Sequence, residues 1–436
     1  MDSEIMELLI EEKKKIFESV SDQIWEFAEA QFQEVQSSAL QIKVLLENGF
    51  RITSPLGGLP TAFLAEYGEG KPVIGILGEY DALIKMSQVC DLTEQVAAVP
   101  NAPGHGCGHN LLGTAGVEAV VAVKELMERE HLKGTIRYYG CPAEEIKAGK
   151  TILIQEGCFS DVDICLSWHP SVNNGLFNSA LAVTTARFHF TGRSSHAAVA
   201  PHRGRSALDA MELMNVGVNY LREHVIPEAR IHYAVVNAGG DAPNIVQAEA
   251  ESLYNVRAPK ASDCMEIYER VCNVARGAAL MTETHVDIEL CNTYMDFLDN
   301  DTLDDLLLEK MEQFVPQTFS EEELAYAKRF QAIGNMPNDS EAISTIVVKD
   351  KHRGPYASTD VGNVSWIVPT GQVYIACFAK GSTLHGWNVV AQGKSCIAHR
   401  GMHTAAKVLG SSAVELLRYP ELVERAKQDF EKARKG

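Results

Sequence analysis

The sequence predicts an α/β protein in which a small α+β unit interrupts a larger domain with a mostly parallel sheet. At 436 residues the chain is longer than a single hydrophobic core usually supports, so two domains are expected. Strand and helix patterns alternate through the first 182 residues, which favours a layered sheet. From Thr184 the order becomes strand-helix-strand-strand-helix-strand, which is the order of a ferredoxin-like unit.

The larger domain is expected to begin with helices. Residues 4 to about 50 carry apolar side chains every three or four positions, which predicts two helices. Two strands, a helix and two further strands are predicted after them, over 61–68, 71–80, 114–130, 134–141 and 161–170. Because polar residues at the carboxyl ends of parallel strands usually carry the chemistry of such a sheet, candidate site residues are sought there.

The smaller unit is predicted over residues 183–295. Its four strands are expected over 184–192, 231–240, 248–259 and 284–294, and its two helices over 205–226 and 261–283. Residues 1–182 and 296–436 are then expected to form one domain around this insertion.

Composition and charge argue against several classes of partner and location. The net charge of −19 argues against nucleic acid or an anionic membrane surface as a partner. The charged N-terminal residues show no apolar signal segment, and no apolar run is long enough to span a membrane. The ten scattered cysteines suggest small core residues rather than a disulfide framework, so the cytoplasm is the expected location.

The loop 104–113, which reads GHGCGHNLLG, is the strongest candidate for metal binding. Cys107 and His109 are one residue apart, so a bent loop could direct both side chains at one ion. Thiolate and imidazole favour zinc-like metals over calcium or magnesium. A single pair of this kind is weak evidence, and it requires further ligands elsewhere in the chain.

Three other segments offer such ligands at strand ends or in turns. CPAEE supplies Glu144 and Glu145, SWHP supplies His169, and STLHGW supplies His385. Each has an ordinary structural explanation, since lone histidines are often hydrogen-bonded and paired glutamates often face solvent. Because one of two adjacent carboxylates can bind metal while the other acts as a base, Glu144 and Glu145 could divide these roles.

Several strings together resemble a known family: GEYDAL, GHGCGHNLLG, GCPAEE, WHP and LHGW with AHRGM. They are similar to subfamily D of the dinuclear zinc aminoacylase/carboxypeptidase family, and most similar to its aminobenzoyl-glutamate hydrolases and indole-3-acetyl-amino acid hydrolases. The resemblance covers essentially the whole chain. It implies a zinc-exopeptidase-like α/β/α catalytic domain over 1–182 and 296–436, with an inserted dimerisation (lid) domain over 183–295.

The resemblance also implies a metal site with two divalent ions, zinc or manganese. The implied ligands are Cys107, His109, Glu145, His169 and His385. Glu144 falls on the family's general base, which takes a proton from a metal-bound water. Many relatives carry a histidine ligand where this chain has Glu79, so Asp81 could either orient a ligand or only hold its loop. His105 is set aside, because the family's ligands are the later Cys107 and His109.

The inserted domain is implied to read the substrate. His196 matches a histidine that reaches into the partner subunit and stabilises the oxyanion. Asn244 and Arg257 stand thirteen residues apart, as in relatives that bind the substrate's free carboxylate, a task suited to a guanidinium. Ser358 lies in the segment 354–366, which resembles the family's pocket-lining loop.

The expected function is metal-dependent hydrolysis of the amide bond of an N-acyl amino acid with a free carboxylate. Two substrates fit this expectation, one like p-aminobenzoyl-glutamate and one like indole-3-acetyl-aspartate. A dipeptidase acting on β-alanyl or other dipeptides is an alternative, and so is a non-catalytic binding protein that metal ions only staple together. A homodimer is expected, or a heteromer with a paralogous chain.

Overall fold

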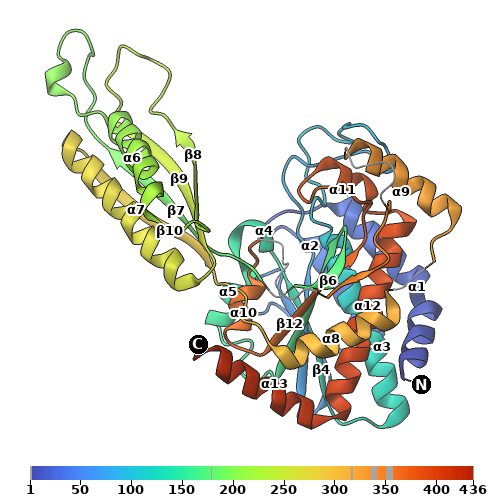
Figure 1. Cartoon of the computed structure of the whole chain (residues 1–436). Coiled ribbons are helices and arrows are strands. Elements are labelled where there is room, and N and C mark those ends of the chain that lie inside the picture. The colour runs from blue at the N-terminus through green and yellow to red at the C-terminus, as the bar shows by residue number, and fades with distance from the viewer. Residues whose placement is uncertain (1, 178, 316–317, 335–340, 350–356, 436) are drawn as a thin grey trace. The chain divides into compact units, whose positions relative to one another are not determined.

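The chain forms two compact units, which the computed structural model describes for residues 2–177, 179–315, 318–334, 341–349 and 357–435 (Figure 1). The second unit spans Ala180–Phe297 and takes in Ala357 and Ser358 from a distant part of the sequence. The remaining described residues, on both sides of that insertion, form the first unit. The expected α/β class with an inserted ferredoxin-like unit is confirmed.

The first unit is built on an eight-stranded sheet in the order β1-β2-β4-β3-β5-β12-β6-β11. Its strands are β1 (Arg51–Thr53), β2 (Phe63–Glu69), β3 (Val73–Glu79), β4 (Gly134–Cys141), β5 (Ile164–Ser171), β6 (Asn174–Leu176), β11 (Val347–Val348) and β12 (Thr370–Ala376). The central strands β4, β3, β5 and β12 run parallel. Strands β1 and β2 pair antiparallel with their neighbours, and β6 pairs antiparallel with β12 and parallel with β11. The carboxyl ends of the central strands therefore meet at one edge.

Helices cover this sheet. They are α1 (Asp2–Phe27), α2 (Val35–Glu47), α3 (His109–Glu130), α4 (Glu144–Lys147), α5 (Gly149–Gln155), α8 (Asp301–Phe314), α9 (Glu321–Ile333), α10 (Val361–Ser365), α11 (Trp387–Gln392), α12 (Cys396–Arg418) and α13 (Pro420–Ala433). Helices α3 and α12 lie side by side against the central strands, and α1 packs on both. No helix within the described ranges is apolar over a length that could cross a membrane.

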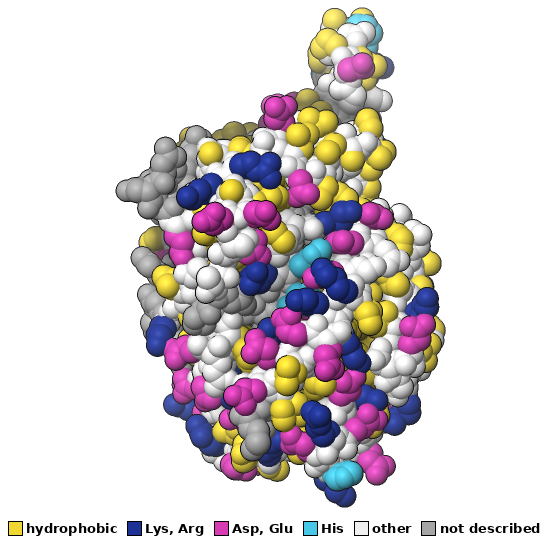
Figure 2. Space-filling view, turned by 90° about the vertical axis from the view of Figure 1, so that its right-hand side faces the viewer, with side chains coloured by type: hydrophobic (Ala, Val, Ile, Leu, Met, Phe, Trp, Pro, Cys, Tyr) yellow, Lys and Arg dark blue, Asp and Glu magenta, His cyan; other side chains and the backbone are white. Residues whose placement is uncertain are grey.

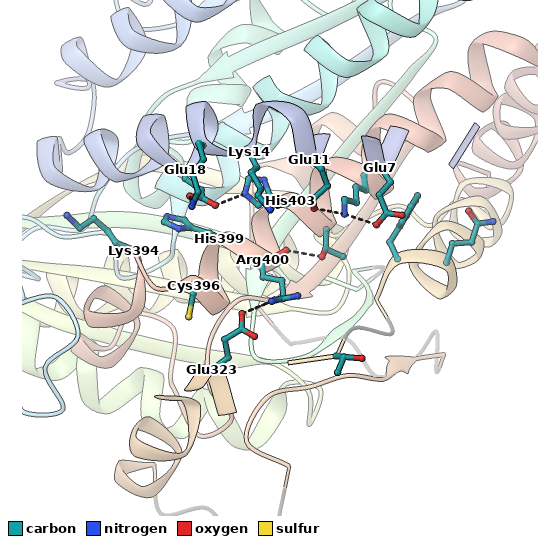
Figure 3. A pocket seen from close by; sticks show the side chains of 16 residues that line it. Glu7, Glu11, Lys14, Glu18, Glu323, Lys394, Cys396, His399, Arg400 and His403 are labelled. Carbon is teal, nitrogen blue, oxygen red and sulfur yellow. Dashed lines mark hydrogen bonds and ion pairs between the residues drawn. The ribbon is translucent and has the colours of Figure 1, made fainter. Parts of the chain in front are cut away.

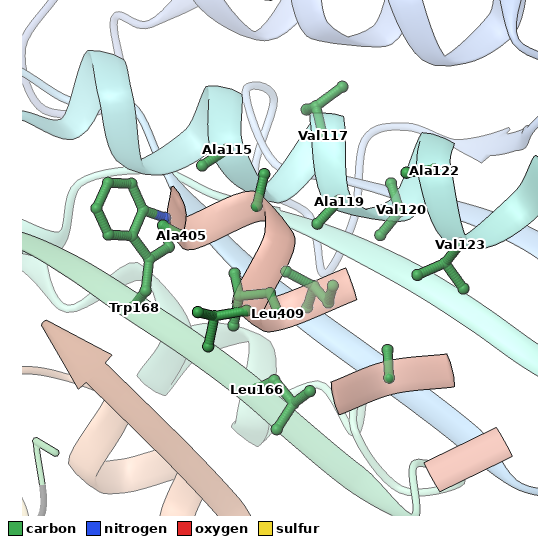
Figure 4. Close-up of a cluster of buried hydrophobic side chains, with 14 of the residues drawn as sticks. Ala115, Val117, Ala119, Val120, Ala122, Val123, Leu166, Trp168, Ala405 and Leu409 are labelled. Carbon is green, nitrogen blue, oxygen red and sulfur yellow. The ribbon is translucent and has the colours of Figure 1, made fainter. Parts of the chain in front are cut away.

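The core between α3, α12 and β5 fixes the parts of the chain that carry the site. Small side chains such as Ala115 and Ala405 allow α3 and α12 to approach closely, and Leu166 and Trp168 of β5 pack beneath them (Figure 4). The indole Nε1 of Trp168 donates a hydrogen bond of 3.0 Å to the carbonyl oxygen of Leu112. This bond ties the end of β5 to the first turn of α3, so the residue after Trp168 is placed next to that turn.

The second unit has the order β7-α6-β8-β9-α7-β10 and a four-stranded sheet arranged β10-β7-β9-β8. Its elements are β7 (Ala182–Thr191), α6 (Ala207–Leu221), β8 (Arg230–Asn237), β9 (Glu249–Ala258), α7 (Ala261–Thr282) and β10 (His285–Tyr294). All of its strand pairs are antiparallel. Both helices pack on the sheet through a separate core that contains Phe188, Met214 and Val271. Strand β8 is an edge strand, and most of its side chains are exposed.

Helix α3 begins earlier than the sequence pattern suggests. The predicted helix starts at Thr114, but α3 starts at His109, directly after Gly108 with a left-handed φ of 75°. A Cβ atom on Gly108 would lie 2.9 Å from Pro170 Cγ and 3.0 Å from Phe378 Cζ, so only glycine fits there. The metal-candidate loop therefore runs straight into the helix, and the helix fixes the position of His109.

Candidate metal centre

The candidate ligands come from separate segments that meet at the carboxyl ends of the parallel strands. Cys107 lies in the loop before α3, His109 is the first residue of α3, and Glu145 lies in α4 just after β4. His169 lies near the end of β5, and His385 lies in the loop between β12 and α11. The strand order brings together residues that are as much as 278 positions apart in the sequence.

Short distances join these side chains. The thiol Sγ of Cys107 lies 3.3 Å from Nε2 of His169. Glu145 lies between two histidines, with Oε2 at 3.3 Å from Nε2 of His385 and Oε1 at 3.9 Å from Nε2 of His109. All five residues predicted as ligands are therefore in one cluster.

Within the described residues, three sets of ligand atoms each fit within 4.8 Å. These sets are Cys107, His109 and His169; Cys107, Glu145 and His385; and Glu79, His109 and Glu144. The first two contain every predicted ligand and share Cys107. The third adds Glu79, which the sequence shows only as a departure from the family's histidine, together with the predicted base Glu144.

Hydrogen bonds orient two of the imidazoles. Nδ1 of His109 lies 2.9 Å from Oδ1 of Asp81, and Nδ1 of His169 lies 2.8 Å from the carbonyl oxygen of Pro170. Both partners are acceptors, so each Nδ1 carries the donated proton. In the neutral rings each Nε2 then offers a lone pair, as a metal ligand requires.

The cluster fits divalent metal ions. Nε2 of His109 and Oε1 of Glu145 are buried and have no hydrogen-bond partner among the described residues. Buried polar atoms are rarely left without a partner, and a cation between the imidazole nitrogen and the carboxylate oxygens would give all of them one. One thiolate with imidazoles and carboxylates is also a donor set that zinc accepts.

Asp81 and Glu34 hold the turn that presents the two adjacent glutamates. Oδ2 of Asp81 accepts a hydrogen bond of 3.0 Å from the amide of Glu145, while its other oxygen contacts His109. Asp81 therefore contacts both the predicted ligand His109 and the backbone of the turn after β4. Oε1 of Glu34 accepts a hydrogen bond of 3.0 Å from the amide of Ala143, which has a left-handed φ of 57°. Burial and the nearby charge of Asp81 raise the pKa of Glu34 to about 7.

The two adjacent glutamates differ in electrostatic environment. Burial, followed by the charges of Glu79 and Glu145, raises the pKa of Glu144 well above its usual range. For Glu145 burial acts in the same direction, but a hydrogen bond to His385 and the charge of His109 outweigh it and lower the pKa to about 2. Adjacent residues with opposite shifts are suited to different roles, one as a proton carrier and one as a permanent anion.

The predicted catalytic residue His196 and the predicted substrate-binding residue Asn244 lie beyond one end of the second unit's sheet. The amide of Ala197 donates a hydrogen bond of 3.0 Å to the carbonyl oxygen of Asn244, which places His196 and Asn244 on neighbouring loops. His196 is exposed, and its Nδ1 accepts weak hydrogen bonds from the amides of Ala198 and Val199. Nε2 of the neutral ring therefore carries the proton and can donate it outward.

The other two predicted substrate-binding residues, Arg257 and Ser358, lie near the opposite end of that sheet. Nη1 of the half-buried Arg257 donates a hydrogen bond of 2.8 Å to Oγ of Ser358, and Ser358 donates one of 2.7 Å to the carbonyl oxygen of Leu181. Along β9, Arg257 stands eight residues from Glu249, the end nearer Asn244. At about 3.3 Å a residue, roughly 26 Å separates the two ends. Of the segment 354–366, residues 354–356 lie outside the described residues.

A separate cavity of about 650 Å³ in the first unit lies along α1 and α12 (Figure 3). Its histidines are paired: Nε2 of His399 lies 2.9 Å from Oδ1 of Asp22, and Nδ1 of His403 lies 2.9 Å from a carboxylate oxygen of Glu118. Acidic and basic side chains are also interspersed over the face shown in Figure 2. The cavity is therefore lined by charged side chains, and both of its histidines already have carboxylate partners.

Comparison with known proteins gives a family profile for part of the chain and relatives that cover most of it. A family profile described as the peptidase dimerisation domain matches residues 179–280. The chain is 42% identical to one of the subunits of p-aminobenzoyl-glutamate hydrolase from Escherichia coli (strain K12), with 97% of this chain and 93% of that protein covered. It is 30% identical to Xaa-Arg dipeptidase of Mus musculus, with 86% and 79% covered.

A solved structure shows the same fold. A dinuclear metal binding peptidase of the M20 family from Bacillus subtilis matches with a TM-score of 0.62 at 18% identity, over 93% of this chain and 99% of that one. At that identity the likeness concerns the fold alone. The family follows from the sequence matches.

Proposed function

This chain belongs to the M20 peptidase family and is an amidohydrolase, and on that basis we propose that it hydrolyses the amide bond of an N-acyl amino acid with a free carboxylate. One observation carries the proposal. A buried carboxylate, Glu144, has an oxygen within 4.8 Å of ligand atoms of His109 and Glu79, beside the five predicted ligands. A base next to a metal cluster is an arrangement that suits metal-dependent hydrolysis of an amide.

We propose that two divalent ions, zinc or manganese, are held by the predicted ligands Cys107, His109, Glu145, His169 and His385. When bound, such ions polarise the amide carbonyl and make water a stronger nucleophile at neutral pH. Asp81 keeps the imidazole of His109 in the orientation that ligation needs, since Oδ1 of Asp81 holds Nδ1 of that ring. Glu34 and Asp81 keep the turn around Glu144 and Glu145 in place.

Glu144 acts as the general base and then as the general acid in this proposal. It takes a proton from the attacking water and delivers that proton to the nitrogen of the departing amine. Its placement at the start of α4 is fixed by the left-handed residue Ala143 before it. The side chain is buried, so bulk water does not compete for the proton.

The remaining predicted residues bind substrate from two subunits. Arg257 binds the free carboxylate of the amino acid, because a guanidinium can donate two parallel hydrogen bonds to it. His196 and Asn244 lie on loops beyond the far end of β9, where Glu249 is roughly 26 Å from Arg257, so they are placed too far to act on the same small molecule. We therefore propose that His196 and Asn244 of one protomer complete the site of its partner, with Nε2 of His196 donating to the developing oxyanion.

p-Aminobenzoyl-glutamate is the substrate that the sequence relatives favour, since the match to that hydrolase extends over 97% of the chain. Indole-3-acetyl-aspartate and a dipeptide are the competing substrates. A cytoplasmic location is part of the same proposal, because the ten cysteines are free thiols, as is usual in a reducing compartment.

A substrate panel tests this function. The protein loaded with Zn²⁺ or Mn²⁺ is assayed by amine release on p-aminobenzoyl-glutamate, indole-3-acetyl-aspartate, a β-alanyl dipeptide and an Xaa-Arg dipeptide. We expect the highest kcat/KM on p-aminobenzoyl-glutamate. Replacing the α-carboxylate of that substrate by a carboxamide is expected to lower kcat/KM by about 10- to 100-fold, because a charged hydrogen bond is lost.

The variant Arg257→Met assigns that loss to one residue. It should reduce kcat/KM for the carboxylate substrate and leave the carboxamide nearly unaffected, so that the two rates converge. Arg187→Met is the matched control, since Arg187 lies on β7 of the same sheet but pairs with Glu251. Undiminished preference for the carboxylate in Arg257→Met would remove Arg257 from the substrate site, and no turnover of any panel member would refute the proposed function.

We propose a homodimer that forms through β8 and α6 of the second unit. In the described part of the chain no strand pairs with the outer edge of β8. Leu213, Val216 and Tyr220 follow each other at helical spacing on α6, and all three are exposed, Tyr220 by 74%. An open strand edge beside an apolar helix face is a surface suited to a second copy of the same unit. The family profile for dimerisation spans both elements.

The double variant Val216→Glu/Tyr220→Glu is expected to be monomeric by sedimentation, whereas the parent sediments at twice the monomer mass. Because His196 acts on the partner's site, the monomer should also lose most of its turnover. Leu290→Glu on β10, the opposite edge strand, is the control and should stay dimeric. An active monomer would contradict the proposed role of His196, and an unchanged dimer would contradict this interface.

A further inference from the structure

A buried lysine lies beside the candidate metal centre. Lys150, on α5, is completely buried, and its Nζ lies 2.5 Å from Oε1 of Glu79 and 2.6 Å from Oδ1 of Asp360. Oδ2 of Asp360 also accepts a hydrogen bond of 3.0 Å from the amide of Lys150. Asp360 therefore holds the lysine at both its backbone and its ammonium group. Three segments are joined at this point, the end of β3, the start of α5 and the start of α10.

A contribution to stability does not by itself explain why Lys150, Glu79 and Asp360 are buried together. Removing an ammonium and two carboxylates from water costs more than their attraction usually returns, and apolar side chains of similar volume often serve as well. Each charged group has a short hydrogen bond here, although one ammonium faces two carboxylates, so the arrangement fixes directions rather than adding a large gain in stability. What the arrangement directs is the carboxylate of Glu79.

The two oxygens of Glu79 have different neighbours. Oε1 contacts Lys150, and Oε2 lies 3.3 Å from Nε2 of His109. Since Nδ1 of His109 is already held by Asp81, Nε2 presents a lone pair to Oε2 when the ring is neutral. Two lone pairs at that distance repel unless a cation lies between them. Glu79 thus has one oxygen occupied by the lysine and the other facing Nε2 of His109, and one of its oxygens lies within 4.8 Å of a carboxylate oxygen of Glu144.

We propose that Glu79 is an additional carboxylate ligand of the metal centre and that Lys150, held by Asp360, is the residue that positions it. This inference rests on the proposed metal-dependent function. By occupying Oε1, Lys150 restricts Glu79 to one oxygen toward the divalent ion and prevents it from rotating away. Asp360 balances the charge of the lysine, so that Glu79 retains negative charge for the metal.

The test uses the full-length protein loaded with Co²⁺, whose visible absorption reports the ligands around the ion. Glu79→Gln keeps the shape of the side chain, and it should weaken binding of one ion at least tenfold and change the absorption bands. Lys150→Met keeps Glu79 but frees its carboxylate, so the same bands should change although no ligand has been removed. Ion content is measured by elemental analysis after dialysis at a fixed free Co²⁺ concentration.

The double variant Lys150→Met/Asp360→Asn separates positioning from charge balance. It has the same net charge as the parent and leaves no unpaired Asp360, so the metal-free protein should regain most of the melting temperature that Lys150→Met loses. The Co²⁺ spectrum should remain altered. Lys310→Met is the matched control, because Lys310 is a buried lysine of α8 paired with Glu309 and Glu415. Its spectrum should equal that of the parent.

The inference is overturned if Glu79→Gln and the double variant both bind Co²⁺ with the parent's affinity and spectrum. Lys150 would then only balance buried charge. That outcome is distinct from failure of the proposed function, which would appear in the parent itself as absence of bound metal or absence of amide hydrolysis.

Discussion

Replacing Glu144 by glutamine is expected to lower turnover of the N-acyl amino acid by about 10²- to 10⁴-fold, the range that a general acid–base residue contributes. Glutamine keeps the size of the side chain but can neither accept the proton of the attacking water nor return it to the amine. Because Glu144 is not one of the five predicted ligands, both metal ions should stay bound. Single-turnover rates and elemental analysis of the same samples check the two halves of this expectation.

Glu156→Gln serves as the control, since Glu156 lies just after α5, outside the ligand cluster. A Glu144→Gln protein that hydrolyses amides as fast as its parent would show that the proposed mechanism is wrong. If the unmodified protein binds metal but hydrolyses no amide, the alternative is favoured, namely a non-catalytic binding protein that metal ions only stabilise.

Replacing Cys107 by alanine is expected to have the largest effect on metal content. Cys107 belongs to two of the three ligand sets, so its loss affects both. Removing even a supporting partner of a ligand typically costs about 10- to 100-fold in metal affinity, and a direct ligand should cost at least as much. Metal titration followed by isothermal calorimetry should show weaker binding, and excess Zn²⁺ should restore part of the turnover.

Cys377→Ala is the matched control, because Cys377 is a buried thiol of the same unit that follows β12, and its backbone amide donates to the carbonyl oxygen of Ser171. It belongs to none of the three ligand sets, so its metal affinity should stay that of the parent. If Cys107→Ala still binds both ions as tightly as the parent does, Cys107 is not a ligand.

The five candidate ligands that the structure brings together could be predicted from the sequence because each is a chemically distinctive residue at a strand end, in a turn or in a glycine-rich loop. Cys107 and His109 are recognisable within one short string, and His169 follows a strand pattern directly. Five such residues are informative together even when each is ambiguous alone. The geometry that joins them is set by the parallel sheet, which the alternation of strands and helices already indicated.

Glu34 and Lys150 were missed for a physical reason. Each occurs in a stretch that is ordinary in sequence, and each acquires a role only when folding buries it against a partner far along the chain, such as Ala143 for Glu34 and Asp360 for Lys150. The residues next to a charged residue in the sequence do not show whether folding will bury it. The only hint was that Lys150 stands directly before the apolar run TILI, where a lysine is unusual.

The spacing of Asn244 and Arg257 was informative in a different way. Thirteen residues apart, they were expected to bind one carboxylate together. In the structure the chain between them includes β9, an extended strand, so sequence proximity becomes spatial separation. Had the intervening segment been a helix, the same thirteen residues would span only about 20 Å, since a helix rises 1.5 Å per residue.

The length of strand β9 therefore sets the distance between Arg257 and the loops that carry His196 and Asn244. Deleting two residues from it would keep every side chain on its own face but bring Arg257 roughly 7 Å closer to the loop of Asn244. Deleting one would turn Arg257 to the opposite face of the sheet. Two properties of this strand are thus constrained: its length, and whether its number of residues is even or odd. Substitutions of single residues would not reveal these constraints, but insertions and deletions in β9 would.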